Sequence, residues 1–151
     1  MVAVLSREKF LTLENSKDVL GYTTKFREDP IYLDPRHKDL GARLITNLEK
    51  LHLSLKLLEL KSSNLDEYYS VSNKLGIPQI NTDKLQNNLF GIECNLNELN
   101  GIDFKKGCYV GQENTARIKL KDKLSKRLFP VEVIEGDLSK DNIIHHENTE
   151  L

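Results

Sequence analysis

One run of the sequence brings together residue types that can do chemistry. Two glycines four residues apart bracket a cysteine and a tyrosine in the run Lys106-Gly107-Cys108-Tyr109-Val110-Gly111-Gln112-Glu113. Gly111 is a candidate helix N-cap, and Lys105 adds a second cation close to the cysteine in sequence. A helix N-terminus and neighbouring cations both stabilise a thiolate. The spacing therefore favours Cys108 as a reactive thiol, with a buried cysteine in a tight turn as the alternative.

The cysteines and histidines do not form a metal-binding pattern. Cys94 and Cys108 lie 14 residues apart without a CxxC spacing, and the four histidines are His37, His52, His145 and His146. Structural zinc sites use closely spaced pairs of these residues. We therefore expect two free thiols in a reducing compartment and no structural zinc site.

The charges are balanced over the chain but separated in its last third. There are 22 basic and 23 acidic residues, a balance that argues against a surface dedicated to nucleic acid. Eight basic residues lie between Phe104 and Arg127, whereas six acidic residues and one lysine follow from Glu132 onward. An RNA- or phosphate-binding module on residues 117–127 is a hypothesis that the lack of interleaved aromatic residues does not favour.

These residues must be positioned by short strands and helices. Short apolar runs predict strands at Val2–Ser6, Lys17–Tyr22 and Gly41–Ile45. Two prolines five residues apart predict a turn, an edge strand and a second turn over Phe26–Arg36, because proline lacks an amide donor. We expect the strand at Ile31–Leu33 to pair antiparallel with Gly41–Ile45.

Two helices are predicted after these strands. A stripe of leucines at spacings of four and three predicts a helix over Thr46–Leu58, although a few leucines alternate as in a strand. Ser62–Leu75 has a serine cap, early acidic residues and a closing Gly76. We expect this second helix to pack on the paired strands through Leu65 and Tyr69.

The last third contains fewer regular elements. Asn81–Asn100 reads mostly as loop, and a helix is predicted from Gly111 to Lys119. Leu128–Ile134, LFPVEVI, is predicted to be a strand. A strand this apolar needs pairing partners, which the polar residues after it hardly supply. We therefore expect the chain to stop inside a domain.

The run KGCYVGQE closely resembles the signature of the YgfZ family, which includes mitochondrial iron–sulfur assembly factors. These proteins are relatives of the glycine-cleavage T-protein, a tetrahydrofolate-dependent aminomethyltransferase. The resemblance extends over roughly Asp29 to Ile134. Its other landmarks are Asp34-Pro35-Arg36, Leu40-Gly41-Ala42-Arg43-Leu44, the helix end Tyr69 to Pro78, Glu93-Cys94-Asn95-Leu96 and Lys126-Arg127-Leu128.

The resemblance implies an α+β fold, in part like the folate-binding fold of the T-protein and YgfZ, with antiparallel strands packed by helices. Residues 1–127 would form the C-terminal half of the folate-binding domain. Residues 128–151 would begin a truncated C-terminal β-barrel, of which only the first strand is visible. The chain then looks like an internal fragment, and its folate pocket would be incomplete.

The resemblance also assigns roles to single residues. Glu93 corresponds to the glutamate that faces the folate pterin, since a carboxylate accepts two parallel N–H bonds from an aminopyrimidine. Cys108 corresponds to the motif cysteine on which YgfZ members depend. Arg36 and Arg117 are candidates for holding the glutamate tail of folate. The alternatives are an exposed loop glutamate for Glu93 and internal ion pairs for both arginines.

The implied function is that of a tetrahydrofolate-binding accessory factor in the assembly or repair of iron–sulfur proteins. Its partners would be folate and iron–sulfur assembly proteins or client enzymes. The alternative is an aminomethyltransferase like the T-protein. No apolar run approaches the roughly 20 residues needed to cross a bilayer, and residues 1–10 do not resemble a secretory signal. We expect a bacterial cytoplasmic protein, with the mitochondrial matrix as the alternative.

Overall fold

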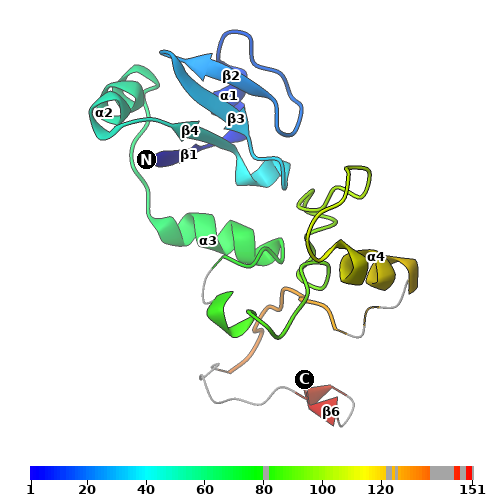
Figure 1. Ribbon diagram of the computed structural model, residues 1–151. Coiled ribbons are helices and arrows are strands. Elements are labelled where there is room, and N and C mark those ends of the chain that lie inside the picture. The colour runs from blue at the N-terminus through cyan, green and yellow to red at the C-terminus, as the bar shows by residue number, and fades with distance from the viewer. Residues whose placement is uncertain (80–81, 122–123, 125, 137–144, 147–148, 151) are drawn as a thin grey trace.

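Four short strands form an antiparallel sheet in the computed structural model, which describes residues 1–79, 82–121, 124, 126–136, 145–146 and 149–150. The strands lie in the order β1-β4-β3-β2 (Figure 1). Their bounds are β1 Val2–Leu5, β2 Thr23–Phe26, β3 Asp29–Leu33 and β4 Ala42–Ile45. The register sets Ile31 opposite Leu44 and Leu33 opposite Ala42. The predicted antiparallel pairing is confirmed.

β3 is an inner strand, so the predicted edge position is wrong. It pairs with β2 on one side and with β4 on the other. Pro30 lies opposite Lys25 of β2, but the ladder with β4 begins only at Ile31. The proline therefore fits an inner strand because its missing donor falls beyond the end of one ladder.

The strand predicted at Lys17–Tyr22 is also wrong. This stretch forms bends and a turn, and β2 begins one residue after it. Gly21 has a φ of 75°, and its N–H donates to the carbonyl of Leu33 at 3.1 Å. The positive φ at this glycine turns the chain into the sheet, which the apolar run did not reveal.

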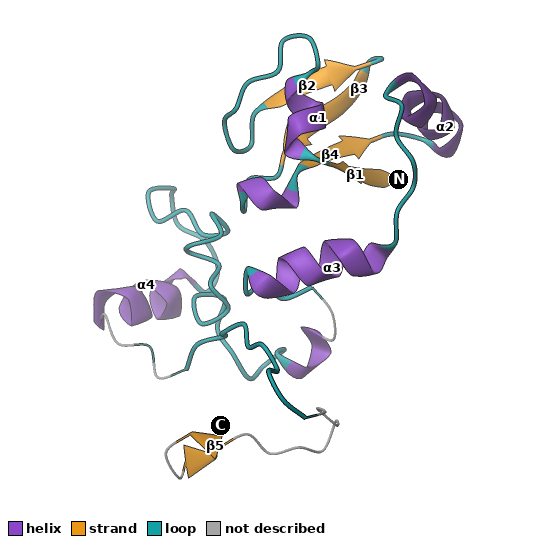
Figure 2. Ribbon diagram, turned by 180° about the vertical axis from the view of Figure 1, so that it is seen from behind, coloured by secondary structure: helices purple, strands orange, loops and turns teal. Residues whose placement is uncertain are grey.

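One face of the sheet forms the first core of the protein. Strand residues alternate so that Leu5, Ile31, Leu33, Ala42 and Leu44 are buried together. The helix α1 (Arg7–Leu11) lies beside the sheet (Figure 2). Its Phe10 packs against these residues, as does Leu58. Gly41 lies just before β4, beside the end of β1. It has a φ of 68°, and a Cβ there would lie 2.0 Å from the carbonyl oxygen of Leu5. Only glycine permits this approach.

The two predicted helices are present, but the second packs elsewhere than expected. α2 spans Leu48–Leu57 and α3 spans Leu65–Lys74, with Asn47 and Asn64 as N-caps. The Leu65 side chain is 66% exposed. On its other side, α3 packs beside a second core made of Leu40, Ile77 and Leu99, through Tyr68, Val71 and Leu75. Leu65 therefore does not pack on the paired strands as expected, whereas Tyr69 is half-buried.

The rest of the described chain consists of turns, one longer helix and short elements. These are the 3₁₀ helices η1 (Lys38–Leu40) and η2 (Thr82–Lys84), the helix α4 (Gln112–Lys121), and the two-residue strands β5 (His145–His146) and β6 (Thr149–Glu150). The loop predicted near residues 81–100 and the helix after Gly111 are confirmed. Within the described residues, no helix combines the length and apolarity that a membrane span requires.

The predicted strand Leu128–Ile134 is not a strand in the structure. The segment has no helix, turn or bend, and the described residues provide no neighbouring strand for it. Its apolar side chains face solvent, with Phe129 69% and Val131 74% exposed. A strand exists only where another backbone completes its hydrogen bonds, and an alternating sequence cannot supply that partner.

Candidate functional site

Cys108 lies on an exposed loop that leads from residue 102 into α4. Asp103 Oδ1 accepts a hydrogen bond from the Lys105 amide at 2.8 Å and shapes the first turn of the loop. The thiol is open to solvent, so the alternative of a buried turn cysteine is not what the structure shows.

The loop and the start of α4 are held together by the residues around the cysteine. Gln112 Oε1 accepts from the Tyr109 amide at 3.2 Å, which resembles one of the two bonds of a capping box. The Lys106 ammonium lies 4.6 Å from the centre of the Tyr109 ring, within cation–π range. Gly111 supplies a φ of 83° just before the helix. The motif residues thus shape the loop that presents Cys108.

Lys119 of α4 contacts residues outside the helix. Its ammonium lies 3.8 Å from the centre of the Phe104 ring and 3.4 Å from Asn97 Oδ1. Arg117 pairs with Glu113 at 2.6 Å along the exposed face of the helix. Exposed pairs of this kind contribute little to stability. Arg117 therefore makes the internal ion pair that was the alternative to binding a ligand.

Glu93 is buried in the turns that precede the loop. Its residue is 6% exposed, and its Oε2 accepts a hydrogen bond from the Phe90 amide at 2.9 Å. The alternative of an exposed loop glutamate is therefore wrong. The neighbouring Cys94 is buried as well, and desolvation, followed by the charge of Glu93, raises the pKa of its thiol. The two cysteines thus sit in opposite environments.

Asn95 joins three segments that are distant in sequence. Its Nδ2 donates to the carbonyls of Leu128, at 2.9 Å, and Gly76, at 3.4 Å. Its Oδ1 accepts from Nε of Arg127 at 2.9 Å. These contacts bring together three of the family landmarks: the end of α3, the ECNL turn and the KRL segment. Sequence reasoning gave Asn95 no role.

Arg36 belongs to a buried ion cluster at the end of the sheet. Its guanidinium binds both oxygens of Asp34, at 3.0 and 2.8 Å, and Arg43 Nε binds the same carboxylate at 2.6 Å. Burial opposes ionisation of Asp34, but the hydrogen bonds from Arg36 and Arg43 outweigh it and hold its pKa below the usual value. Arg36 therefore makes an internal ion pair, as the alternative had it.

Tyr68 of α3 closes this cluster. Its hydroxyl oxygen lies within hydrogen-bond distance of Arg36 Nη2 at 3.1 Å, Arg43 Nη2 at 2.5 Å and Gln79 Nε2 at 2.9 Å. The cluster thereby joins the sheet to α3, although Arg43 and Tyr68 were not predicted as functional residues. Only the resemblance had marked Asp34 and Arg43, through the DPR and LGARL runs.

A groove of about 1210 Å³ opens between α3 and the segment after α4. Its walls include Tyr69 and Asn73 on one side and Leu128 to Glu132 on the other. None of the four predicted site residues, Glu93, Arg36, Arg117 and Cys108, lines it. Among the described residues, no three His, Cys, Asp or Glu side chains gather as metal ligands.

In the described part of the chain, no hydrogen bond or ion pair joins the residues predicted to bind tetrahydrofolate, Glu93, Arg36 and Arg117, to one another. Glu93 closes its own turn, Arg36 binds Asp34, and Arg117 binds Glu113. Each of these side chains already makes a hydrogen bond or an ion pair with a residue close to it in sequence, and the three lie in separate segments. Tetrahydrofolate binding therefore stays a prediction.

Comparison with known proteins identifies related chains. The chain is 34% identical over 115 residues to the mitochondrial iron–sulfur cluster assembly factor IBA57 homolog of Dictyostelium discoideum, which covers 76% of this chain and 28% of that protein. The IBA57 factors of mouse and human, both named as mitochondrial, are 37% and 35% identical over 105 and 102 residues. These matches cover 70% and 68% of this chain and 28% of each relative.

The matched region contains the candidate site. Because 115 of the 151 residues are matched, the matched stretch contains residues 37–115 wherever it begins, and thus both Glu93 and Cys108. No family model and no solved structure matches the chain significantly. The chain spans little more than a quarter of the length of these relatives. Its homologues are iron–sulfur cluster assembly factors of the IBA57 type.

Proposed function

We propose that this chain acts in iron–sulfur cluster assembly in the mitochondrion, with Cys108 as its working thiol. The observation that carries the proposal is the position of Cys108. Cys108 is exposed on the loop that precedes α4, and it lies inside the stretch shared with mitochondrial assembly factors. The mitochondrial relatives favour the matrix over the bacterial cytoplasm that we expected from the sequence.

One exposed thiol suits a shared rather than a resident cluster. Iron–sulfur clusters are held by several cysteine thiolates, usually four. Cys94 is buried, so Cys108 is the thiol that the described surface offers. A cluster bound through Cys108 would need its other ligands from a second protein. The partner in this proposal is therefore an iron–sulfur assembly protein or a client enzyme that carries ligands of its own.

Tetrahydrofolate binding is a separate proposal and rests on the resemblance at Glu93. The carboxylate suits an aminopyrimidine edge chemically, but its Oε2 already accepts the Phe90 amide. The aminomethyltransferase alternative is not favoured, because the curated relatives are named as assembly factors.

A rescue experiment tests the proposed function. The whole chain is expressed in the mitochondria of cells that lack their own IBA57-type factor. We expect the activity of a cluster-containing enzyme to rise, while an enzyme without a cluster stays unchanged. No rise in the cluster-containing enzyme, despite normal amounts of the expressed chain, would contradict the proposal.

A further inference from the structure

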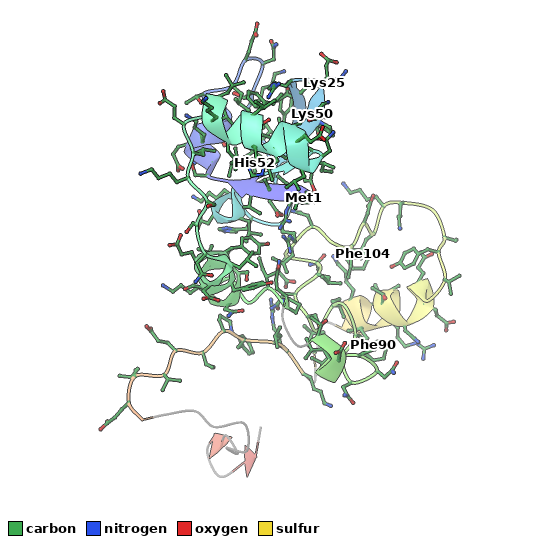
Figure 3. All side chains as sticks on the ribbon, turned by 90° about the vertical axis from the view of Figure 1, so that its left-hand side faces the viewer. Met1, Lys25, Lys50, His52, Phe90 and Phe104 are labelled. Atoms are coloured by element: carbon green, nitrogen blue, oxygen red, sulfur yellow. The ribbon has the colours of Figure 1, made fainter. Side chains whose placement is uncertain are left out.

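The segment Leu128–Ile134, which has no helix, turn or bend, leaves one side of its backbone open. Leu128 is bonded to the body of the protein: its N–H donates to the Glu93 carbonyl at 2.9 Å, and its own carbonyl accepts from Asn95. In an extended chain, successive residues direct their N–H and C=O groups to opposite sides. Phe129, Val131 and Val133 therefore direct theirs away from the body, and no described residue bonds them. Figure 3 shows the segment leaving the body with side chains on both sides.

The same segment is apolar and exposed. Phe129, Val131 and Ile134 are 69%, 74% and 96% exposed. An exposed, apolar and unpaired extended segment is a template for another strand.

The charges at the two ends of the segment are complementary to those of a second copy of this chain, which favours that copy as the pairing strand. Lys126 and Arg127 precede the segment, whereas Glu132 and Glu135 lie in and after its second half. An antiparallel pair centred on Val131 sets Arg127 of each copy opposite Glu135 of the other. A parallel pair would place like charges side by side, which is unfavourable. Arg127 can take part because its side chain remains 37% exposed beside Glu98.

The proline in the segment fits this register. When two Val131 residues exchange their N–H and C=O groups, Phe129 and Val133 exchange theirs as well. Pro130 then lies opposite Glu132 at a position that makes no hydrogen bond between the strands. Its missing donor is therefore not needed.

We propose that two copies of the chain associate through antiparallel pairing of Leu128–Ile134, around a two-fold axis at Val131. The interface is isologous, because each copy offers the same residues to the other. It covers the exposed Phe129 and Val131 and completes the open side of the segment. The proposal is independent of the function in iron–sulfur assembly.

Sedimentation equilibrium of the whole chain over a concentration series tests the proposal. We expect a monomer–dimer equilibrium. Val131→Pro removes the two central hydrogen bonds, one from each copy, and should raise the dissociation constant about tenfold or more. Glu132→Pro is the matched control, because its amide lies outside the bonding between strands, and it should leave the dissociation constant within about threefold. Circular dichroism of each variant shows whether it is folded.

A charge variant tests the register without a proline. Glu135→Lys places a lysine opposite Arg127 at both ends of the ribbon. We expect added salt to weaken the wild-type dimer and to strengthen that of the variant, because salt screens attraction in one and repulsion in the other. A chain that is monomeric at every concentration would overturn the proposal. So would a dimer that neither Val131→Pro nor Glu135→Lys changes.

Discussion

At the scale of single residues, the two cysteines lie in opposite environments. Cys108 is exposed, whereas burial and the neighbouring Glu93 raise the pKa of the Cys94 thiol. Alkylation needs access and a thiolate, and Cys94 offers little of either. We expect iodoacetamide to label Cys108 first in the folded protein, as followed by peptide mass spectrometry across a pH series. Earlier labelling of Cys94 would contradict the structure.

A substitution at Glu93 tests the folate proposal while preserving the turn. In Glu93→Gln, the side-chain oxygen can still accept the Phe90 amide, so the unfolding midpoint should change little. The loss of the carboxylate should weaken tetrahydrofolate binding by about 1–3 kcal/mol. Titration calorimetry compares the two proteins. Equal affinities would remove Glu93 from any folate site.

The sequence was a better guide to the position of the exposed thiol than to the hydrogen-bond and ion-pair partners of other residues. Cys108 and its motif could be found from residue types and spacing, and the loop indeed presents the thiol. The internal partners of Arg36 and Arg117 could only be left as alternatives. Asn95 was missed, because its three contacts join residues 19 to 33 positions away and no local pattern reports them.

At the scale of elements, the ion cluster around Asp34 links the sheet to α3. Its carboxylate is fully buried between Arg36 and Arg43. Asp34→Asn should lower the free energy of unfolding by about 3 kcal/mol, since it leaves two partly buried guanidinium groups without a counterion. Chemical denaturation measures the loss. Tyr68→Phe is the milder companion and should cost about 1 kcal/mol.

The same cluster predicts a dependence of stability on pH. The pKa of Asp34 is lower in the folded protein than its usual value of about 3.9. Its contribution is therefore fully present above that value and is lost as the pH falls through the lower, folded pKa. We expect wild type and Asp34→Asn to converge in stability on acidification. A constant difference between them from neutral to strongly acidic pH would contradict this assignment.

Substitutions at Gly41 and Gly107 form a matched pair that tests how closely Gly41 approaches the end of β1. Gly41→Ala combines a φ of 68° with a Cβ 2.0 Å from the Leu5 carbonyl oxygen, so it should cost at least about 2 kcal/mol. A Cβ at Gly107 meets no atom within 4 Å, so Gly107→Ala should stay within about 0.5 kcal/mol of wild type. Thermal unfolding of both variants gives the comparison. Equal midpoints would show that the approach at Gly41 is looser than described.

The sequence pattern predicted where the helices lie better than it predicted which segments they contact. The leucine stripe located α2, and Gly111 located the start of α4. The early acidic residues and Gly76 located α3, although Asn64 caps it and not the predicted serine. The inner position of β3, the packing of α3 beside Leu40 and the unpaired state of residues 128–134 all depend on which segments meet. Local sequence contains little of that information, because it is set by tertiary contacts.

At the scale of the whole molecule, the described residues form a core on the sheet and a second core beside α3, and the loop that carries Cys108 belongs to neither. Cys108 is exposed, whereas Cys94 is buried in the turns. The predicted division into residues 1–127 and 128–151 stays a prediction. What links this architecture to iron–sulfur assembly is the thiol on the loop within the stretch shared with the IBA57 factors.

The rescue of an iron–sulfur enzyme by Cys108→Ser, compared with Cys94→Ala, tests this link most directly. Both variants remove one thiol, and their amounts and unfolding midpoints are measured alongside. Cys108→Ser should remain folded, because an exposed thiol adds little packing, and should lose the rescue almost completely. Cys94→Ala should retain the rescue in proportion to its folded amount. A Cys108→Ser chain that rescues the enzyme as well as wild type would contradict the account.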